Sequence, residues 1–128
     1  MEAKPPQPCA NMRNVVLVVE DEPFARLLGV DLLEQAGFAV LQACNADEAL
    51  WLLEAHPEVR VVFSDIDMPG SLDGIELARR ICQCWPRIGI VLTSGHNIRE
   101  EMLPREGRFL AKPYDGKTLV RQIEEIMH

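Results

Sequence analysis

Five short apolar runs, each followed by a segment with helical character, constrain the fold of this chain most strongly. The first run, Val15–Val19, is apolar throughout, whereas a strand with one solvent-facing side would alternate with polar residues. It is therefore predicted to be a strand buried on both faces. The other predicted strands are Phe38–Ala43, Val59–Ser64, Ile88–Leu92 and Arg108–Ala111. Strands that alternate with helices form a parallel sheet through right-handed crossovers, so we predict one doubly wound α/β domain.

Helix start and stop signals separate these runs. The first helix is predicted over Glu22 to Ala36, because Pro23 suits a first helical turn and Gly37 suits a helix end. Two further helices begin with the spacing of a capping box, in which a short polar residue is followed three residues later by Glu. These pairs are Asn45 with Glu48 and Asp73 with Glu76.

The last two predicted helical segments differ in how clearly the sequence signals a helix. His96–Gly107 has weak periodicity that Pro104 interrupts, which predicts a short or irregular fourth helix. Asp115 is the predicted N-cap of the final helix, whose buried stripe contains Leu119 and Ile123.

The charge balance narrows the function classes. Thirteen Lys and Arg against twenty Asp and Glu give a net charge of -7, which argues against direct binding to nucleic acid because phosphate backbones need a cationic surface. No apolar run approaches the roughly 20 residues that span a bilayer, and residues 1–14 lack the apolar core of a signal peptide. We therefore expect a cytoplasmic protein without a membrane partner.

The cysteines and histidines indicate no metal or disulfide chemistry. The four cysteines show neither C-x-x-C spacing nor the density of a disulfide scaffold, so reduced and unliganded thiols are expected. They are Cys9, Cys44, Cys82 and Cys84. The three histidines are scattered along the chain and form no motif with them.

Acidic and polar residues follow the predicted strands. Glu20 and Asp21 come after the first strand, Asp65 after the third and Thr93 after the fourth, and Lys112 follows the fifth. Ligands of doubly wound sheets bind beyond these carboxyl ends. Carboxylates about 4 Å apart repel by about 4 kcal/mol per pair at an effective dielectric constant of 20, which one lysine does not offset. The cluster therefore predicts a divalent cation with oxygen ligands, and Mg²⁺ is the natural candidate.

The stretches "VVLVVEDEP", "FSDIDMPG", "DG", "LTSGH" and "FLAKPYD" occur in this order, each beside a predicted strand or helix start. Together they resemble the receiver domain of two-component response regulators. The resemblance covers residues 14–128 and leaves residues 1–13 as a mobile tail. It implies a flavodoxin-like sheet of five parallel strands in the order 2-1-3-4-5.

The resemblance also implies roles for the acidic residues. Asp65 matches the phosphoacceptor, whose carboxylate attacks a phosphohistidine and becomes an acyl phosphate. Glu20 and Asp21 match the Mg²⁺-binding acids, and Asp65 together with the backbone carbonyl of Asp67 would complete the protein ligands. Lys112 matches the lysine that pairs with the phosphoryl group.

Further positions match the switch elements of the family. Thr93 corresponds to the hydroxyl that turns toward the phosphoryl group, and Phe109 to the aromatic switch residue. A cis peptide is implied before Pro113. The implied partners are a sensor histidine kinase or phosphotransfer protein and a downstream protein target, with self-phosphorylation and slow hydrolysis as the activity. The sequence leaves weak homodimerisation open.

Three features depart from the commonest receivers. The loop between Pro69 and Asp73 is one residue longer, and the stretch from Thr93 to Lys112 is a few residues shorter. Asp67 places an acid two residues after the phosphoacceptor, near the approach of a hydrolytic water. We hypothesise that Asp67 modulates dephosphorylation.

Two alternative functions fit parts of the pattern. Asp65 and Asp67 also form the D-x-D motif of haloacid-dehalogenase-type phosphatases, although that family places its metal-binding acids after the lysine. A receiver-like module that binds proteins without phosphorylation is the other alternative. The order of the motifs argues against the phosphatase, and the complete set of acidic, hydroxyl and lysine positions favours the phosphoacceptor over the module that is not phosphorylated.

Overall fold

The structure, a computed structural model, describes residues 14–70, 72–96, 98–104 and 107–127. These residues form a parallel five-stranded sheet in the order β2-β1-β3-β4-β5. The strands are β1 (Val15–Val19), β2 (Ala39–Ala43), β3 (Val59–Asp65), β4 (Gly89–Ser94) and β5 (Gly107–Ala111). The predicted doubly wound sheet and its strand order are confirmed.

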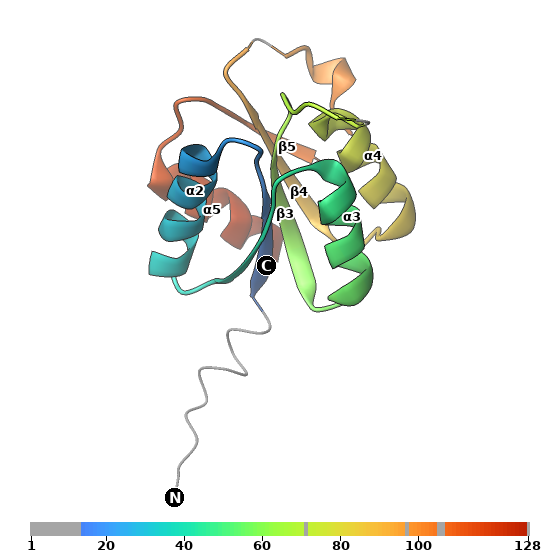
Figure 1. Cartoon of the computed structure of the whole chain (residues 1–128). Coiled ribbons are helices and arrows are strands. Elements are labelled where there is room, and N and C mark those ends of the chain that lie inside the picture. The colour runs from blue at the N-terminus through green and yellow to red at the C-terminus, as the bar shows by residue number, and fades with distance from the viewer. Residues whose placement is uncertain (1–13, 71, 97, 105–106, 128) are drawn as a thin grey trace, which may run out of the picture.

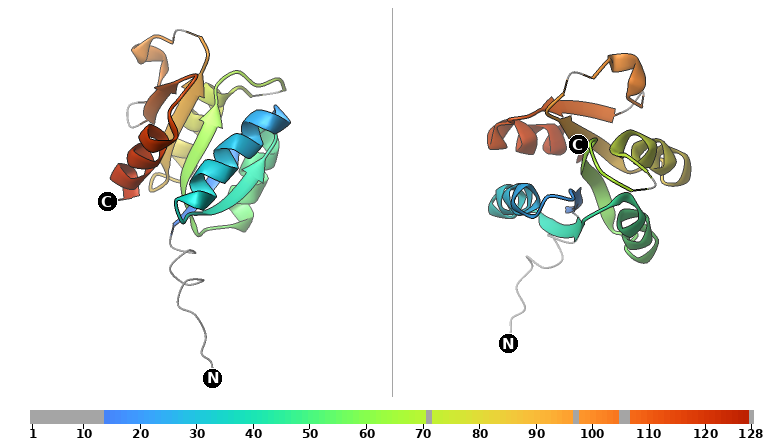
Figure 2. Two further views of the ribbon diagram at one scale, coloured as in Figure 1. Left: turned by 90° about the vertical axis from the view of Figure 1, so that its left-hand side faces the viewer. Right: turned by 45° about the horizontal axis from the view of Figure 1, so that its top comes forward.

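Helices cover both faces of the sheet (Figures 1 and 2). The α-helices are α2 (Pro23–Gln35), α3 (Ala46–Ala55), α4 (Gly74–Cys84) and α5 (Gly116–Met127). Figure 2 shows α2 and α5 side by side on one face, and α3 and α4 lie on the other. Between β4 and β5, the described residues form only the 3₁₀ turn η1 (Glu100–Met102), which confirms the short, irregular fourth helix.

The central strands β1, β3 and β4 are largely buried because an apolar layer packs on each face of the sheet. All five residues of β1 are buried, as the uninterrupted apolar run predicts. Leu17 and Val62 face the layer under α3 and α4, while Val16 and Phe63 face the layer under α2 and α5. Burying such side chains stabilises the fold by about 1.5–3 kcal/mol each.

The capping signals act much as the sequence predicts. The Asp73 side chain accepts from the backbone N–H of Glu76 at 2.9 Å, and the Glu76 side chain accepts in return from Asp73, which completes the box that begins α4. Asn45 caps α3 in the same way, but Glu48 instead accepts from the backbone N–H of Cys44 at 2.7 Å. At Asn45 the N-cap bond is therefore present, but the Glu48 side chain binds the residue before the N-cap instead of the N-cap itself.

Two strands extend beyond their predicted ends. β3 continues to Asp65, and β4 begins at Gly89 and continues to Ser94. The backbone N–H of Lys112 donates to the Ser94 carbonyl at 2.9 Å, so pairing with β5 continues past the apolar residues from which the strand was predicted. Because Asp65 and Thr93 are register partners on neighbouring strands, the sheet itself fixes their backbones.

The structure bears on the predicted tail and on the cysteines only in part. Residues 1–13, the predicted tail, lie outside the described residues, and so does Cys9. The cysteines at 44, 82 and 84 form no disulfide. Across the described part of the chain, no helix combines the length and hydropathy needed to cross a membrane.

Gly74 ties α4 to the strand end that carries Asp65. Its N–H donates to the Ile66 carbonyl at 3.0 Å, and a Cβ at this position would overlap the backbone carbonyl of Asp65 and lie 2.6 Å from the Ile66 Cα. We expect Gly74→Ala to lower the free energy of unfolding by about 2–3 kcal/mol, because backbone must move. Urea denaturation measures the change. Gly95→Ala is the matched control, since nothing lies within 4 Å of its Cβ position, and an equal loss in both variants would contradict the expected clash.

Candidate functional site

Three carboxylates converge at the carboxyl ends of β1 and β3. One oxygen from each of Glu20, Asp21 and Asp65 lies within 4.8 Å of the other two. Glu20 and Asp65 are buried, with 6% and 5% of their surfaces exposed, whereas Asp21 is exposed. The cluster predicted from the sequence is therefore present, with one member facing solvent.

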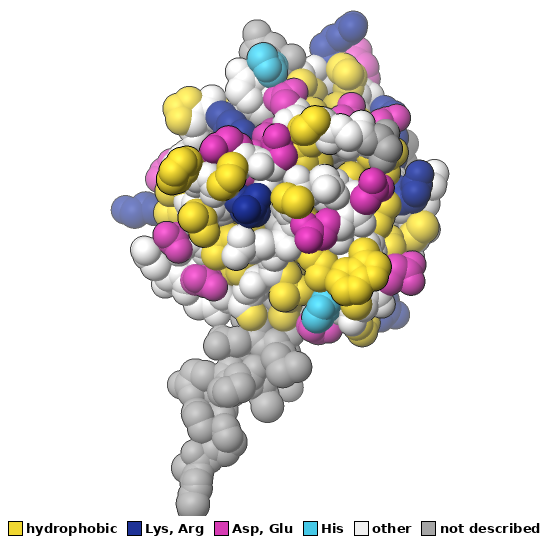
Figure 3. All heavy atoms as spheres, in the orientation of Figure 1, with side chains coloured by type: hydrophobic (Ala, Val, Ile, Leu, Met, Phe, Trp, Pro, Cys, Tyr) yellow, Lys and Arg dark blue, Asp and Glu magenta, His cyan; other side chains and the backbone are white. Residues whose placement is uncertain are grey.

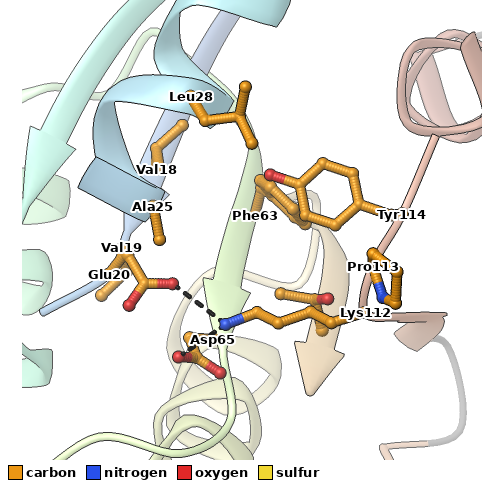
Figure 4. A pocket seen from close by; sticks show the side chains of 11 residues that line it. Val18, Val19, Glu20, Ala25, Leu28, Phe63, Asp65, Lys112, Pro113 and Tyr114 are labelled. Carbon is orange, nitrogen blue, oxygen red and sulfur yellow. Dashed lines mark hydrogen bonds and ion pairs between the residues drawn. The ribbon is translucent and has the colours of Figure 1, made fainter. Parts of the chain in front are cut away.

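Lys112 brings a positive charge into the cluster from the end of β5. Its Nζ donates to Asp65 Oδ2 at 3.2 Å and to Glu20 Oε1 at 3.4 Å, as the dashed lines in Figure 4 mark. The Lys112–Pro113 peptide is cis, as the resemblance implies. One ammonium thus serves two carboxylates, and Asp21 adds a third negative charge.

The pKa shifts express this imbalance of charge. Burial raises the pKa of Glu20, and the nearby Asp65 carboxylate raises it further. Burial opposes the charged form of Lys112, but the Asp65 and Glu20 carboxylates outweigh it and raise its pKa. The surroundings therefore disfavour the anionic form of Glu20 and favour the cationic form of Lys112.

Both oxygens of Asp65 have a donor. Lys112 binds Oδ2, and the backbone N–H of Asp67 donates to Oδ1 at 3.1 Å. The second oxygen of Glu20 accepts from the backbone N–H of Glu22 at 3.1 Å. These contacts hold the two buried carboxylates in fixed orientations at the strand ends.

The two predicted switch residues occupy different positions. Thr93 is buried beside Asp65, and its hydroxyl donates to the Leu110 carbonyl on β5 at 2.6 Å. Phe109 is half-buried and packs against the core layer beneath α3 and α4. Their switch roles remain predictions.

The Asp67 side chain bridges to Ser94 on β4. Asp67 is a candidate residue from the sequence, whereas Ser94 is not. The Asp67 carboxylate accepts from the Ser94 hydroxyl at 2.6 Å, and Oδ2 lies 4.0 Å from His96 Nε2. Ser94 directly follows Thr93 in the chain. That adjacency was the available signal, but a serine at a strand end commonly needs no function.

An apolar cavity of about 410 Å³ opens beside Asp65. No pattern in the sequence predicts it. Figure 4 shows Tyr114 and Leu28 on its walls, opposite the charged side chains. The Tyr114 ring packs edge-on against Phe63 at a centroid distance of 5.4 Å, and burial raises the pKa of its hydroxyl. The full lining is Val18, Val19, Glu20, Ala25, Leu28, Phe63, Asp65, Thr93, Lys112, Pro113 and Tyr114.

Comparison with known proteins decides what this arrangement represents. Residues 16–124 match the sequence family described as the response regulator receiver domain. The chain belongs to the response regulator receiver family. Such receivers are signalling phosphoacceptors of two-component systems, so this receiver is no metabolic enzyme, and the phosphatase alternative is set aside.

Individual relatives of this receiver differ in length. The response regulator receiver protein CpdR of Brucella abortus (strain 2308) is 32% identical over 120 residues, which cover 91% of this chain and 98% of that protein. The sensor kinase CckA of the same organism is 35% identical over 117 residues. These cover 88% of this chain but only 12% of the kinase.

A solved structure agrees with the fold of this receiver. The signal receiver domain of an HD domain-containing protein from Pseudomonas fluorescens Pf-5 has a TM-score of 0.81 at 30% identity. The match covers 91% of this chain and 98% of that structure. Receiver domains take phosphoryl groups from histidine kinases, and the acidic cluster described above is typical of their Mg²⁺ site.

Proposed function

We propose that this receiver accepts a phosphoryl group on Asp65 from a phosphohistidine of a sensor kinase or phosphotransfer protein, and then signals through contacts with another protein. The observation that carries the proposal is the convergence of Glu20, Asp21 and Asp65 around one lysine. Carboxylates crowded in this way at a strand end are poorly suited to a purely structural role.

The donor set fits Mg²⁺. Three carboxylates within 4.8 Å of one another offer hard oxygen ligands, and Lys112 neutralises only one of their charges. Mg²⁺ retains several waters, so a site with few protein ligands and one exposed carboxylate suits it. The Asp67 carbonyl remains a proposed further ligand. When bound, Mg²⁺ would neutralise charge on the phosphoryl oxygens.

The chemistry assigned to Asp65 is a nucleophilic displacement. A carboxylate oxygen forms a bond to phosphorus while the bond from phosphorus to the imidazole nitrogen breaks, and the imidazole takes a proton. Lys112, 3.2 Å from Asp65, orients the carboxylate before the reaction and can pair with the phosphoryl oxygens afterwards. The cavity beside Asp65 gives an imidazole ring an apolar space to enter.

The first turns of α2 supply a docking surface for the phosphodonor. Phe24, Leu27 and Leu28 recur at helical spacing and are 81%, 49% and 55% exposed, and Leu28 also lines the cavity. Figure 3 shows hydrophobic side chains gathered over α2 at the left of the molecule. An exposed apolar stripe that leads to the reacting carboxylate suits a protein donor.

Phe24→Ser is expected to slow phosphotransfer from a protein donor about tenfold, because exposed aromatic anchors contribute strongly to protein interfaces. A panel of radiolabelled histidine kinases and phosphotransfer proteins identifies the donor and gives the rate. Uptake from a small acyl phosphate, which needs no docking, is the reference for each variant. Trp51→Ser is the matched control, since Trp51 is 68% exposed on α3. An equal loss in both variants would argue against docking at α2.

Intact-mass analysis after incubation with a small acyl phosphate and Mg²⁺ tests the proposed function. One added phosphoryl group is expected. If no phosphoryl group is added to a folded protein under these conditions, the chain is a receiver that binds partners without phosphorylation. The expected cytoplasmic location and the response of Thr93 and Phe109 to phosphorylation stay predictions.

A further inference from the structure

The Ser94 hydroxyl fixes the Asp67 carboxylate through a directional hydrogen bond. Ser94 is buried, with 1% of its surface exposed, and its Oγ accepts from the backbone N–H of His96 at 3.0 Å. A hydroxyl has a single proton to donate. That proton points to Asp67 Oδ2, 2.6 Å away. The bond is therefore short, partly buried and charge-assisted, which makes it stronger than an ordinary surface contact.

This bridge joins the end of β3, which carries the proposed phosphoacceptor, to the end of β4. Asp67 lies two residues after Asp65 and donates its backbone N–H to Asp65 Oδ1. Ser94 lies one residue after Thr93, whose Cα is the register partner of Asp65. The bridge consequently fixes the Asp67 carboxylate between the ends of β3 and β4, two residues after Asp65 in the chain.

The carboxylate remains open to water despite this bond. The Asp67 side chain is 45% exposed, and both the bond to Ser94 and the approach of His96 involve Oδ2. Oδ1 is therefore the oxygen left to receive a further hydrogen bond. A fixed carboxylate beside a reacting carboxyl group can orient a water molecule by accepting a hydrogen bond from it.

We propose that Ser94 is a positioning residue for hydrolysis of the acyl phosphate on Asp65, acting through Asp67. This inference rests on the proposed function. In the reaction, the water oxygen bonds to phosphorus, the bond from phosphorus to the Asp65 oxygen breaks, and inorganic phosphate leaves with release of a proton. Asp67 orients the water, and Ser94 keeps Asp67 in place, so the bridge shortens the lifetime of the phosphorylated state.

The test follows loss of the phosphoryl group after loading. Protein is loaded with a small acyl phosphate and Mg²⁺, the donor is removed by rapid desalting, and intact mass is recorded over time. Ser94→Ala is expected to lengthen the lifetime about fivefold, as the loss of one orienting hydrogen bond implies. Asp67→Ala is expected to lengthen it at least as much. The double variant should match Asp67→Ala alone, because Ser94 acts only through that carboxylate.

A matched control separates positioning from general loss of a buried hydroxyl. Ser64 is buried on the neighbouring strand β3, and its hydroxyl donates to the backbone carbonyl of Asp65 at 3.0 Å rather than to Asp67. Ser64→Ala is expected to keep the wild-type lifetime. Thermal melting of each variant shows that it is folded. An equal increase in lifetime for Ser64→Ala and Ser94→Ala would overturn the assignment.

Three other outcomes have distinct meanings. If wild-type protein takes up a phosphoryl group but Ser94→Ala loses it at the wild-type rate, the role of Ser94 is wrong and the proposed function stands. The role also fails if the effects of Ser94→Ala and Asp67→Ala multiply in the double variant. If wild-type protein takes up no phosphoryl group, the proposed function fails and this role fails with it.

Discussion

Replacing Asp65 with asparagine is expected to abolish phosphoryl uptake altogether. The amide has nearly the shape of the carboxylate, and its oxygen can still accept from Lys112 Nζ, which now lies 3.2 Å from Oδ2. The amide is nevertheless a far weaker nucleophile and brings no negative charge to a divalent ion. The buried strand end at β3 should remain folded, so the expected loss is chemical rather than structural.

Intact mass after incubation with a small acyl phosphate and Mg²⁺ measures this loss. Asp31→Asn, which removes an exposed acid from α2, is the control and should take up one phosphoryl group like wild type. Phosphorylated Asp65→Asn protein would place the acceptor at another residue. Tandem mass spectrometry would then identify that residue.

Glu20→Gln is expected to stabilise the metal-free protein and to remove most of its response to Mg²⁺. Glu20 is buried near Asp65, and both burial and that neighbour raise its pKa. The neutral amide has neither cost, although it loses the ionic part of its contact with Lys112. We expect a gain of about 1 kcal/mol at neutral pH, or about 4 °C in melting temperature.

The pH dependence of that gain follows from the direction of the shift. A carboxyl group whose pKa is raised by folding favours the folded state at low pH, and this contribution is lost as pH rises through the raised pKa. The advantage of Glu20→Gln over metal-free wild type should therefore grow as pH rises above about 4.5. Differential scanning calorimetry in chelator measures it. A variant that is less stable than wild type at neutral pH would show that the contact with Lys112 outweighs the cost of burial.

The strands could be predicted from the sequence because each is read from a local pattern, whereas their order in the sheet came from the family resemblance. An uninterrupted run such as Val15–Val19 has few ways to bury both faces outside a parallel sheet. The caps at Asn45 and Asp73 are equally local, since each bond closes within three residues. Even the weak pattern before Pro104 correctly indicated a short fourth helix, since the described residues between β4 and β5 form only the 3₁₀ turn η1.

The acidic cluster could also be predicted, for a topological reason. Parallel strands end at the same edge of the sheet, so residues that follow different strands must meet there. Glu20, Asp65 and Lys112 are far apart in the chain yet lie within hydrogen-bonding distance. The functional roles of these residues still come from resemblance and from the proposals above.

The Ser94–Asp67 bridge and the cavity beside Asp65 depend on the direction in which individual side chains point. The hydrophobic pattern of a sequence does not specify that direction. The Ser94–Asp67 bridge needs a side chain at the end of β4 and one in the loop after β3 to turn toward each other, and no local pattern predicts that pairing. The cavity beside Asp65 depends on how the Tyr114 ring packs against Phe63. The match of Phe109 to a switch position likewise does not specify its packing, and the residue is half-buried against the core layer beneath α3 and α4.

Calorimetric titration of metal-free protein with Mg²⁺ tests the acidic cluster most directly. Glu20, Asp21 and Asp65 should together bind one ion per chain, and the melting temperature should rise with free Mg²⁺ as a ligand specific for the folded state requires. Asp21→Asn, which removes the exposed ligand without disturbing a buried contact, should weaken binding strongly. Absence of saturable binding in wild type, or unchanged affinity in Asp21→Asn, would contradict a metal site at these strand ends.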